Sequence, residues 1–171
     1  MTDIEIAKEE LRREGVTCAA VKDGKVVTSE KRGIAPLIEW YEDGADSADD
    51  SRGGEYGADD ADHVDSADDS RGGEMQGYSV ADKVVGKAPA MMYVLLGVSQ
   101  VYACVMTNTA KEILTDAGIA CSADTLTDTI LRDDKADICP MEKAVMDIDE
   151  PEAAFDAIKE AISRMAANTN K

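Results

Sequence analysis

Aromatic residues make up only 4% of this 171-residue chain, which contains one tryptophan, one phenylalanine and one histidine. The core must therefore be built from aliphatic side chains. His63 lies in a stretch rich in Asp and Gly, which is more typical of a solvated loop residue than of a ligand or a base. The four cysteines are far apart and form no CxxC pair. This spacing argues against zinc-ribbon and zinc-finger ligand sets and is typical of buried, reduced thiols, so we expect no metal site.

Basic residues are also scarce, with 18 Lys and Arg against 36 Asp and Glu and a formal net charge of −18. Such a chain repels phosphate backbones and anionic lipid surfaces, so we expect it to bind neither nucleic acid nor membranes. No window approaches the 18 consecutive apolar residues of a membrane-spanning helix, and the start, MTDIEIAKEELRREG, is charged where a signal peptide is apolar. We therefore expect a cytoplasmic protein, whose apolar share of 44% predicts one globular domain over residues 1–171.

The densest run of charge is an acidic repeat. The ten residues DSADDSRGGE at Asp46–Glu55 recur unchanged at Asp65–Glu74. Residues 43–76 contain 12 acidic and two basic residues, a net charge of −10 out of the total of −18. Because this stretch has almost nothing to bury, we expect a duplicated, mobile surface insert. Calcium binding is the alternative, but an EF-hand loop needs an oxygen ligand at its third position and glycine at its sixth, where Ala48 and Ser51 stand.

Outside this insert, hydrophobic periodicity and turn residues predict alternating helices and strands. Asp23-Gly24 between two β-rich runs predicts a hairpin, and each later strand is followed by a helix. This order predicts an α/β fold with a mixed five-stranded sheet and helices on both faces. The predicted elements are a helix ending near Glu14, strands over Thr17–Lys22 and Lys25–Ser29, a helix over Ile34–Tyr41, a strand over Tyr78–Ala81, a helix over Ala88–Leu96, a strand over Val101–Met106, a helix over Thr109–Ala117 capped by Asn108, a strand from Ile119, and helices opening at Cys139 and Asp149.

Open α/β sheets bind ligands where strands end and helices begin, and two such segments are basic. They are Ser29–Ile34 and Val80–Ala88. Backbone N–H groups at a helix start, together with lysine charge, suit an anion such as a phosphate. The alternative is that Asp82 caps a helix, Gly86 permits close packing and the lysines are solvated. The candidate ligand-binding residues of these segments are Lys31, Arg32, Gly33, Asp82, Lys83, Gly86 and Lys87.

A third helix start, Cys139-Pro140-Met141-Glu142, offers a nucleophile. The helix dipole favours a thiolate at this position, so an enzyme could use Cys139 as its nucleophile and Glu142 or Lys83 to move protons. No histidine lies nearby to act as the usual base. The alternative is an ordinary helix start with Pro140 at its first position and Cys139 buried.

Three stretches together resemble a known family. They are VKDGKVVTSEKRGIAPLIEW, ADKVVGKAPAMMYVLLGVSQVYACVMT and CPMEKAVMDIDEPEAAFDAI, which cover most of the chain outside the acidic repeat. Their sequence closely resembles domain of unknown function 1893, a family of small bacterial and archaeal proteins related in fold to cytidine deaminases. The resemblance implies a three-layer α/β/α fold of the cytidine-deaminase-like type.

The resemblance does not imply that this chain catalyses zinc-dependent deamination. Zinc deaminases place H-x-E at the start of one helix and P-C-x-x-C at the start of the next, where they hold the metal. The corresponding segments here, Gly33–Leu37 and Asp82–Lys87, contain neither His nor Cys. We therefore expect a protein without a cofactor whose cleft binds an anionic small molecule such as a nucleotide. The alternatives are a zinc-independent enzyme that uses Cys139 on a nucleobase-like substrate, and a structural or interaction protein.

Overall fold

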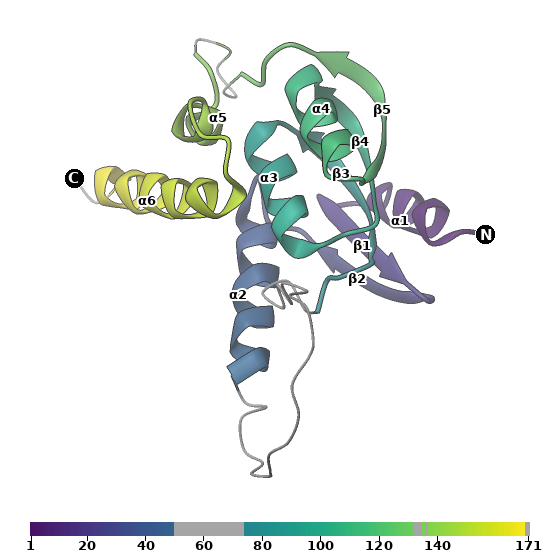
Figure 1. The fold of residues 1–171 in the computed structure, drawn as a ribbon. Helices are drawn as coiled ribbons and strands as arrows, with labels where there is room; N and C mark the ends of the chain where they lie inside the picture. The colour runs from purple at the N-terminus through teal and green to yellow at the C-terminus, as the bar shows by residue number, and fades with distance from the viewer. Residues whose placement is uncertain (50–73, 132–134, 136, 170–171) are drawn as a thin grey trace, which may run out of the picture.

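The computed structural model describes residues 1–49, 74–131, 135 and 137–169. At its centre is a five-stranded sheet in the order β2-β1-β3-β4-β5 (Figure 1). β1 pairs antiparallel with both β2 and β3, whereas β3, β4 and β5 run parallel to one another. The sheet is therefore mixed, as the sequence predicts. Its strands are β1 (Cys18–Lys22), β2 (Lys25–Ser29), β3 (Ser79–Val85), β4 (Gln100–Thr107) and β5 (Ala120–Thr127).

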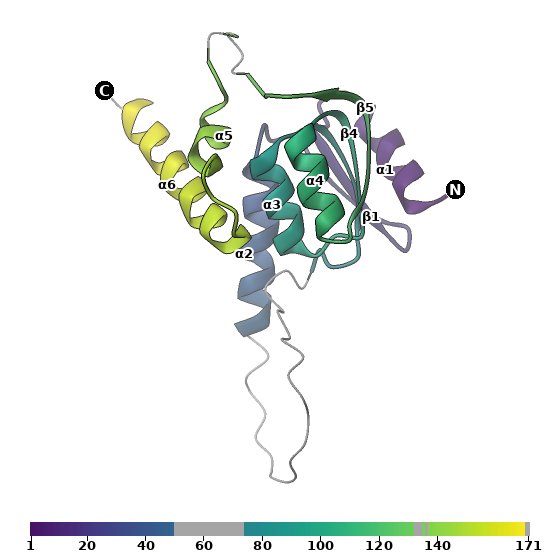
Figure 2. The ribbon, with the colours of Figure 1, turned by 45° about the horizontal axis from the view of Figure 1, so that its top comes forward.

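Helices cover both faces of the sheet, so the fold has three layers. Figure 2 shows α1 alone on one side and α2, α3 and α4 on the other. α5 and α6 pack on the outside of α3. The helices are α1 (Asp3–Leu11), α2 (Ala35–Asp49), α3 (Lys87–Leu96), α4 (Asn108–Asp116), α5 (Pro140–Val145) and α6 (Pro151–Thr169).

The two faces carry cores of unequal size. The larger core lies under α3, whose Met92, Tyr93 and Leu96 are fully buried. The smaller one lies under α1 and includes Ala7, Leu11 and residues of β1 and β3. α1 is only nine residues long and packs mainly on β1 and β3, with fewer contacts to β4. None of the described helices covers the outer part of this face, over β5 and the adjoining part of β4.

Local signals place the turns and several caps correctly. Asp23 and Gly24 both have positive φ, 50° and 77°, as a two-residue hairpin turn between β1 and β2 requires. Glu5 accepts a 2.7 Å hydrogen bond from the Thr2 backbone N–H and completes a capping box at α1. Helix α4, in contrast, is capped by Thr107, whose hydroxyl accepts from the Ala110 N–H at 3.0 Å. The prediction that Asn108 caps this helix was wrong by one residue.

Element lengths differ from the prediction in four places. α1 ends at Leu11 rather than near Glu14. β3 continues to Val85, because its last residues pair with β4, and β5 continues to Thr127 along β4. α2 continues to Asp49 and so enters the acidic segment 43–76 that we expected to be a loop. Residues 50–73, which hold most of the repeat and His63, lie outside the described residues.

None of the described helices combines the length and the apolar composition that a membrane-spanning helix needs.

Candidate functional site

A pocket lies beside the C-terminal end of α1, on the part of the sheet that α1 leaves uncovered. Its volume is about 430 Å³, within the range of small-molecule sites. We call it the α1 pocket. Its walls come from α1, from the loop that follows α1 and from β3, β4 and β5, and its lining residues are Lys8, Leu11, Arg12, Arg13, Glu14, Gly15, Lys83, Tyr102, Cys104 and Asp124.

Strand register aligns the floor of the α1 pocket. Asp82 pairs with Ala103, and Ala103 pairs with Ala123 on β5. The next residue on each strand points to the opposite face, which is the face of α1. Lys83, Cys104 and Asp124 therefore form one row across three parallel strands, although they are distant in sequence.

The α1 pocket is basic, whereas the chain as a whole is acidic. Four cationic side chains line it, against the two carboxylates of Glu14 and Asp124. Lys8 lies 4.0 Å from the centre of the Tyr102 ring, a cation–π contact. Within the part of the chain that the structure describes, neither Arg12 nor Lys83 forms an ion pair. The pocket thus holds positive charge that a bound anion could neutralise.

The hydroxyl of Tyr102 connects β4 to β5 on the floor of the α1 pocket. This hydroxyl donates a hydrogen bond to the carboxylate of Asp124. That hydrogen bond, with smaller contributions from burial and from the neighbouring Cys104 thiol, raises the pKa of Tyr102 well above its usual value. The phenol therefore stays protonated at neutral pH, and its hydrogen bond holds Asp124 in place.

Of the residues that the sequence predicts to bind a ligand, only Lys83 lines the α1 pocket. Its neighbour Asp82 points to the other face of β3 and is only 7% exposed. There it accepts a 2.6 Å hydrogen bond from the hydroxyl of Tyr93, which lies 3.5 Å from the Cys18 sulfur. Burial raises the pKa of Asp82 to about 6, although the Tyr93 hydrogen bond opposes this shift. Asp82 thus belongs to a buried cluster and not to an open cleft.

The predicted anion position at the start of α3 is filled by the chain itself. The two carboxylate oxygens of Glu142 accept hydrogen bonds from the backbone N–H groups of Lys87, at 2.8 Å, and Ala88, at 3.1 Å. A Cβ atom on Gly86 would lie 2.4 Å from a Glu142 oxygen, so a larger residue there would displace this carboxylate. The Lys87 ammonium donates to the carbonyl of Met146 at 3.0 Å. A carboxylate from α5 therefore occupies the place where we expected a ligand.

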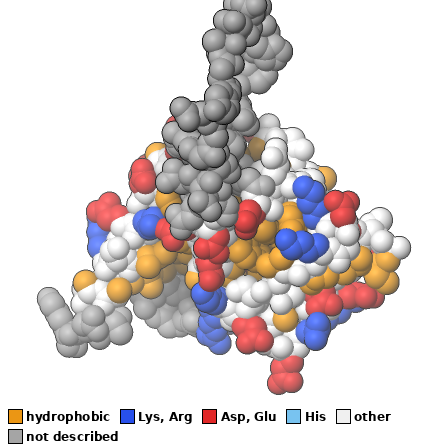
Figure 3. Space-filling model, turned by 90° about the horizontal axis from the view of Figure 1, so that it is seen from below, with side chains coloured by type: hydrophobic (Ala, Val, Ile, Leu, Met, Phe, Trp, Pro, Cys, Tyr) orange, Lys and Arg blue, Asp and Glu red, His pale blue; other side chains and the backbone are white. Residues whose placement is uncertain are grey.

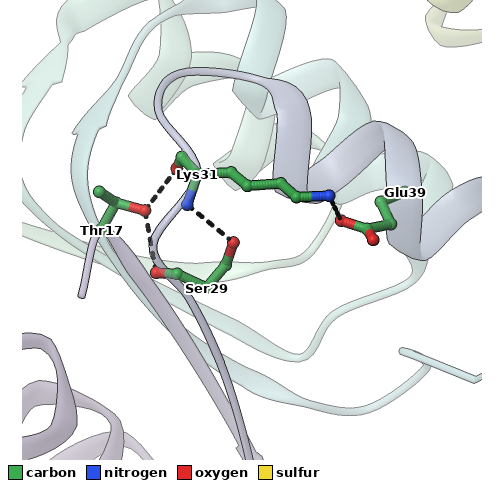
Figure 4. A network of polar contacts seen from close by, with 4 residues as sticks. All are labelled: Thr17, Ser29, Lys31 and Glu39. Atoms are coloured by element: carbon green, nitrogen blue, oxygen red, sulfur yellow. Dashed lines mark hydrogen bonds and ion pairs between the residues drawn. The ribbon is translucent and has the colours of Figure 1, made fainter. Parts of the chain in front are cut away.

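The first basic segment is held in a separate network (Figure 4). The Lys31 ammonium lies 2.7 Å from a carboxylate oxygen of Glu39 on α2. The Thr17 hydroxyl donates to the backbone carbonyls of Ser29 and Lys31, which fixes the chain between β2 and α2. Arg32 and Gly33 are exposed beside this network. None of these residues lines the α1 pocket.

The three predicted catalytic residues do not meet in one pocket. Cys139 is half-buried at the start of α5, and its backbone N–H donates to the carbonyl of Ile130 at 3.0 Å. Glu142 is engaged at the start of α3, and Lys83 lies on the α1 side of the sheet. Cys139 and Glu142 thus share the start of α5, whereas Lys83 lies across the sheet from them.

A second hollow of about 290 Å³ lies between β2, α2 and residues 74–78. Three carboxylates, those of Glu39, Asp43 and Glu74, line it against the single ammonium of Lys25. Figure 3 shows a face on which acidic and basic side chains alternate with hydrophobic patches. This hollow therefore suits an anion less well than the α1 pocket does.

Among the described residues, no group of three or more His, Cys, Asp or Glu is arranged to hold a metal ion.

Sequence reasoning missed most of the α1 pocket. One signal was present in the first helix, where Arg12-Arg13 end a segment with an apolar stripe. Another was the run VYACVM, whose period-2 alternation places Tyr102 and Cys104 on one face of the strand. The residues that only the structure brings together are Lys8, Arg12, Arg13, Tyr102, Cys104 and Asp124.

Comparisons with known proteins agree with this fold. The sequence model of a domain of unknown function, DUF1893, matches residues 67–162. A crystal structure of a DUF1893 family protein from Thermotoga maritima, at 2.70 Å resolution, superposes with a TM-score of 0.68. The two chains are 20% identical, and the match covers 96% of this chain and 91% of that one, so it supports the fold alone. No curated protein matches the sequence.

Proposed function

Because the chain belongs to the DUF1893 family, whose description names no activity, we propose a function from its own geometry: the α1 pocket binds a small anionic molecule such as a nucleotide. The observation that carries this proposal is the gathering of four cationic side chains around one cavity in a chain with a net charge of −18. Positive charge concentrated in a cavity focuses the local potential and attracts anions even to an acidic protein.

The shape and chemistry of the α1 pocket support a small ligand. A volume of about 430 Å³ suits a molecule of nucleotide size better than a polymer. The guanidinium of Arg12 can contact phosphate or carboxylate oxygens in a forked geometry, whereas Arg13 is paired with Glu10 at 2.7 Å, and Lys83 adds a point charge on the floor. The Tyr102 hydroxyl and the Cys104 thiol supply weaker polar contacts beside them.

Calorimetric titration with a nucleoside monophosphate and with the matching uncharged nucleoside tests the proposal. We expect the nucleotide to bind, the nucleoside to bind at least tenfold more weakly, and the affinity for the nucleotide to fall as salt is added. The double variant Arg12→Gln with Lys83→Gln should weaken nucleotide binding about tenfold or more.

The matched control is Lys31→Gln with Arg32→Gln, which removes two cations from the other basic segment. This control should bind the nucleotide as the wild type does. If the control loses affinity and the pocket variant keeps it, the ligand lies at the basic segment between β2 and α2, near Lys31, and not in the α1 pocket. If neither the nucleotide nor inorganic phosphate binds, the proposal is wrong.

We also propose that the fold is of the cytidine-deaminase-like type and that the protein is cytoplasmic. The three layers and the mixed sheet in the order β2-β1-β3-β4-β5 support the first point. The strongly acidic composition, with a net charge of −18, supports the second. Superposition on deaminase structures and fractionation of cells that express the protein are the corresponding tests.

A further inference from the structure

The α1 pocket contains a nucleophile that anion binding does not require. Cys104 on β4 is half-buried and packs against the small core beneath α1. Strand register places it between Lys83 and Asp124, and Tyr102 lies two residues before it on the same face. A thiol is thus built into the floor of a cavity whose walls carry positive charge.

We propose that Cys104 is a thiol–disulfide exchange site, at which the α1 pocket captures a small disulfide that carries carboxylates, such as oxidised glutathione. This inference rests on the proposed anion binding. The Cys104 thiol passes its proton to water, and its sulfur then attacks one sulfur of the bound disulfide. A bond forms between Cys104 and that sulfur, the original S–S bond breaks, and the departing thiolate takes a proton from water. The incoming disulfide is the oxidant, so no other is needed.

The other three cysteines lack this combination of access and charge. Cys18 is 2% exposed, and burial raises the pKa of its thiol well above the usual value. The Cys121 sulfur faces α4, where it lies 3.8 Å from the Thr115 hydroxyl and 3.9 Å from the Lys111 carbonyl. Cys139 stands at the start of α5, and like Cys121 it does not line the α1 pocket. Access and local charge decide which thiols exchange, so Cys104 is favoured.

The charge of the α1 pocket also specifies the class of disulfide. Lys8, Arg12 and Lys83 attract carboxylates and repel ammonium groups at short range, and they outnumber the opposing carboxylates of the lining, Glu14 and Asp124. An anionic disulfide should therefore spend more time beside Cys104 than a neutral one, and a cationic disulfide less. Charge at the walls, and not the thiol alone, gives the site its selectivity.

The test is to incubate the full-length protein with three disulfides of different charge. They are oxidised glutathione, neutral bis(2-hydroxyethyl) disulfide and cationic cystamine. For each disulfide, the rate with the protein is divided by its rate with a free thiol, which gives a standardised rate. Mass spectrometry of the intact protein, followed by peptide mapping, gives the rate at each cysteine. We expect glutathione to modify Cys104 before the other thiols, at a standardised rate about tenfold above that of cystamine.

Variants separate the role of charge from that of exposure. Arg12→Gln with Lys83→Gln should slow the glutathione reaction at Cys104 about tenfold and leave the neutral disulfide unaffected. Cys104→Ser should abolish the fast modification, and the control Cys121→Ser should retain it. Circular dichroism and thermal melting confirm that each variant is folded. Equal standardised rates for the three disulfides, or earlier modification of Cys121 or Cys139, would overturn the proposal.

This inference and the proposed function fail in distinguishable ways. The nucleotide titration measures reversible binding and needs no thiol chemistry, whereas the mass shift requires it. If the nucleotide binds but Cys104 shows no preference for glutathione, exchange is refuted and binding stands. If no nucleotide binds but Cys104 reacts selectively with glutathione, the nucleotide is the wrong ligand and the exchange site stands.

Discussion

The hydroxyl of Tyr93 donates a 2.6 Å hydrogen bond to the carboxylate of Asp82, and this bond joins α3 to the centre of the sheet. Both side chains are buried, and the Cys18 sulfur lies 3.5 Å from the same hydroxyl. The three groups come from β1, β3 and α3, so the cluster ties together the first and the middle parts of the chain. A carboxylate in this position makes stability depend on pH.

Asp82 should make the protein less stable as the pH rises from about 4 to 6. Burial raises the pKa of Asp82 from 3.8 to about 6, so in this interval the folded chain keeps a proton that the unfolded chain has lost. The stabilisation present below pH 4 is lost as the pH passes 6, by about 3 kcal/mol for a shift of this size. Urea unfolding of the wild type and Asp82→Asn between pH 4 and 7.5 measures this contribution.

The difference in unfolding free energy between the wild type and Asp82→Asn isolates the contribution of Asp82, because the many surface carboxylates titrate in both proteins. An asparagine oxygen can still accept the Tyr93 hydrogen bond and carries no charge. Asp82→Asn should therefore gain about 3 kcal/mol relative to the wild type between pH 4 and pH 7.5. A difference that does not change with pH would show that Asp82 titrates at its ordinary value.

Tyr93→Phe should destabilise the protein by about 1–3 kcal/mol at pH 7.5, because it removes the hydroxyl that donates to a buried, ionised carboxylate. The same change should raise the pKa of Asp82 further, since the hydrogen bond favours the charged form. Urea unfolding gives the first quantity, and NMR titration of the Asp82 carboxyl gives the second. The control is Tyr78→Phe: Tyr78 is also buried, but its hydroxyl makes no hydrogen bond recorded among the described residues. Equal losses in the two variants would contradict the role given to Asp82.

Gly86→Ala should cost about 1–3 kcal/mol, because the added methyl group would lie 2.4 Å from the Glu142 carboxylate. The backbone of Gly86, with φ of −98°, is not in the left-handed region, so the cost comes from space alone. Glu142→Ala removes both the obstacle and the cap on α3. In that background Gly86→Ala should cost at least 1 kcal/mol less, which a double-mutant cycle of unfolding free energies measures. Additive costs would show that Glu142 does not occupy the start of α3 in solution.

Thr107→Ala should cost about 1 kcal/mol, because its hydroxyl accepts from the Ala110 N–H and caps α4. Asn108→Ala should change stability by less than about 0.5 kcal/mol, since its side chain reaches an exposed carboxylate, Asp128, instead of the helix N-terminus. Thermal unfolding of the two variants gives the comparison. A larger loss of stability for Asn108→Ala than for Thr107→Ala would show that Asn108 caps α4, as the sequence predicts.

The order of elements could be predicted because its signals are local. The hairpin at Asp23-Gly24 and the left-handed glycines Gly97 and Gly118, just past the ends of α3 and α4, depend on backbone conformations that few other residues adopt. The cap of α4 was misplaced by one residue because Thr107 and Asn108 are both good caps. The end of β3 was misjudged because its last residues are held by β4, which lies about 20 residues further along the chain.

The sequence by itself determined the α/β class, the mixed five-stranded sheet, the aliphatic core and the strongly acidic balance, since composition, periodicity and turn chemistry act over a few residues. Only the tertiary structure decided which polar groups meet. Strand register aligned Lys83, Cys104 and Asp124, the alternation of β3 sent Asp82 to the other face to meet Tyr93, and α5 brought Glu142 to a helix that starts 55 residues earlier. These contacts depend on strand pairing and helix docking between distant segments, which no local pattern specifies.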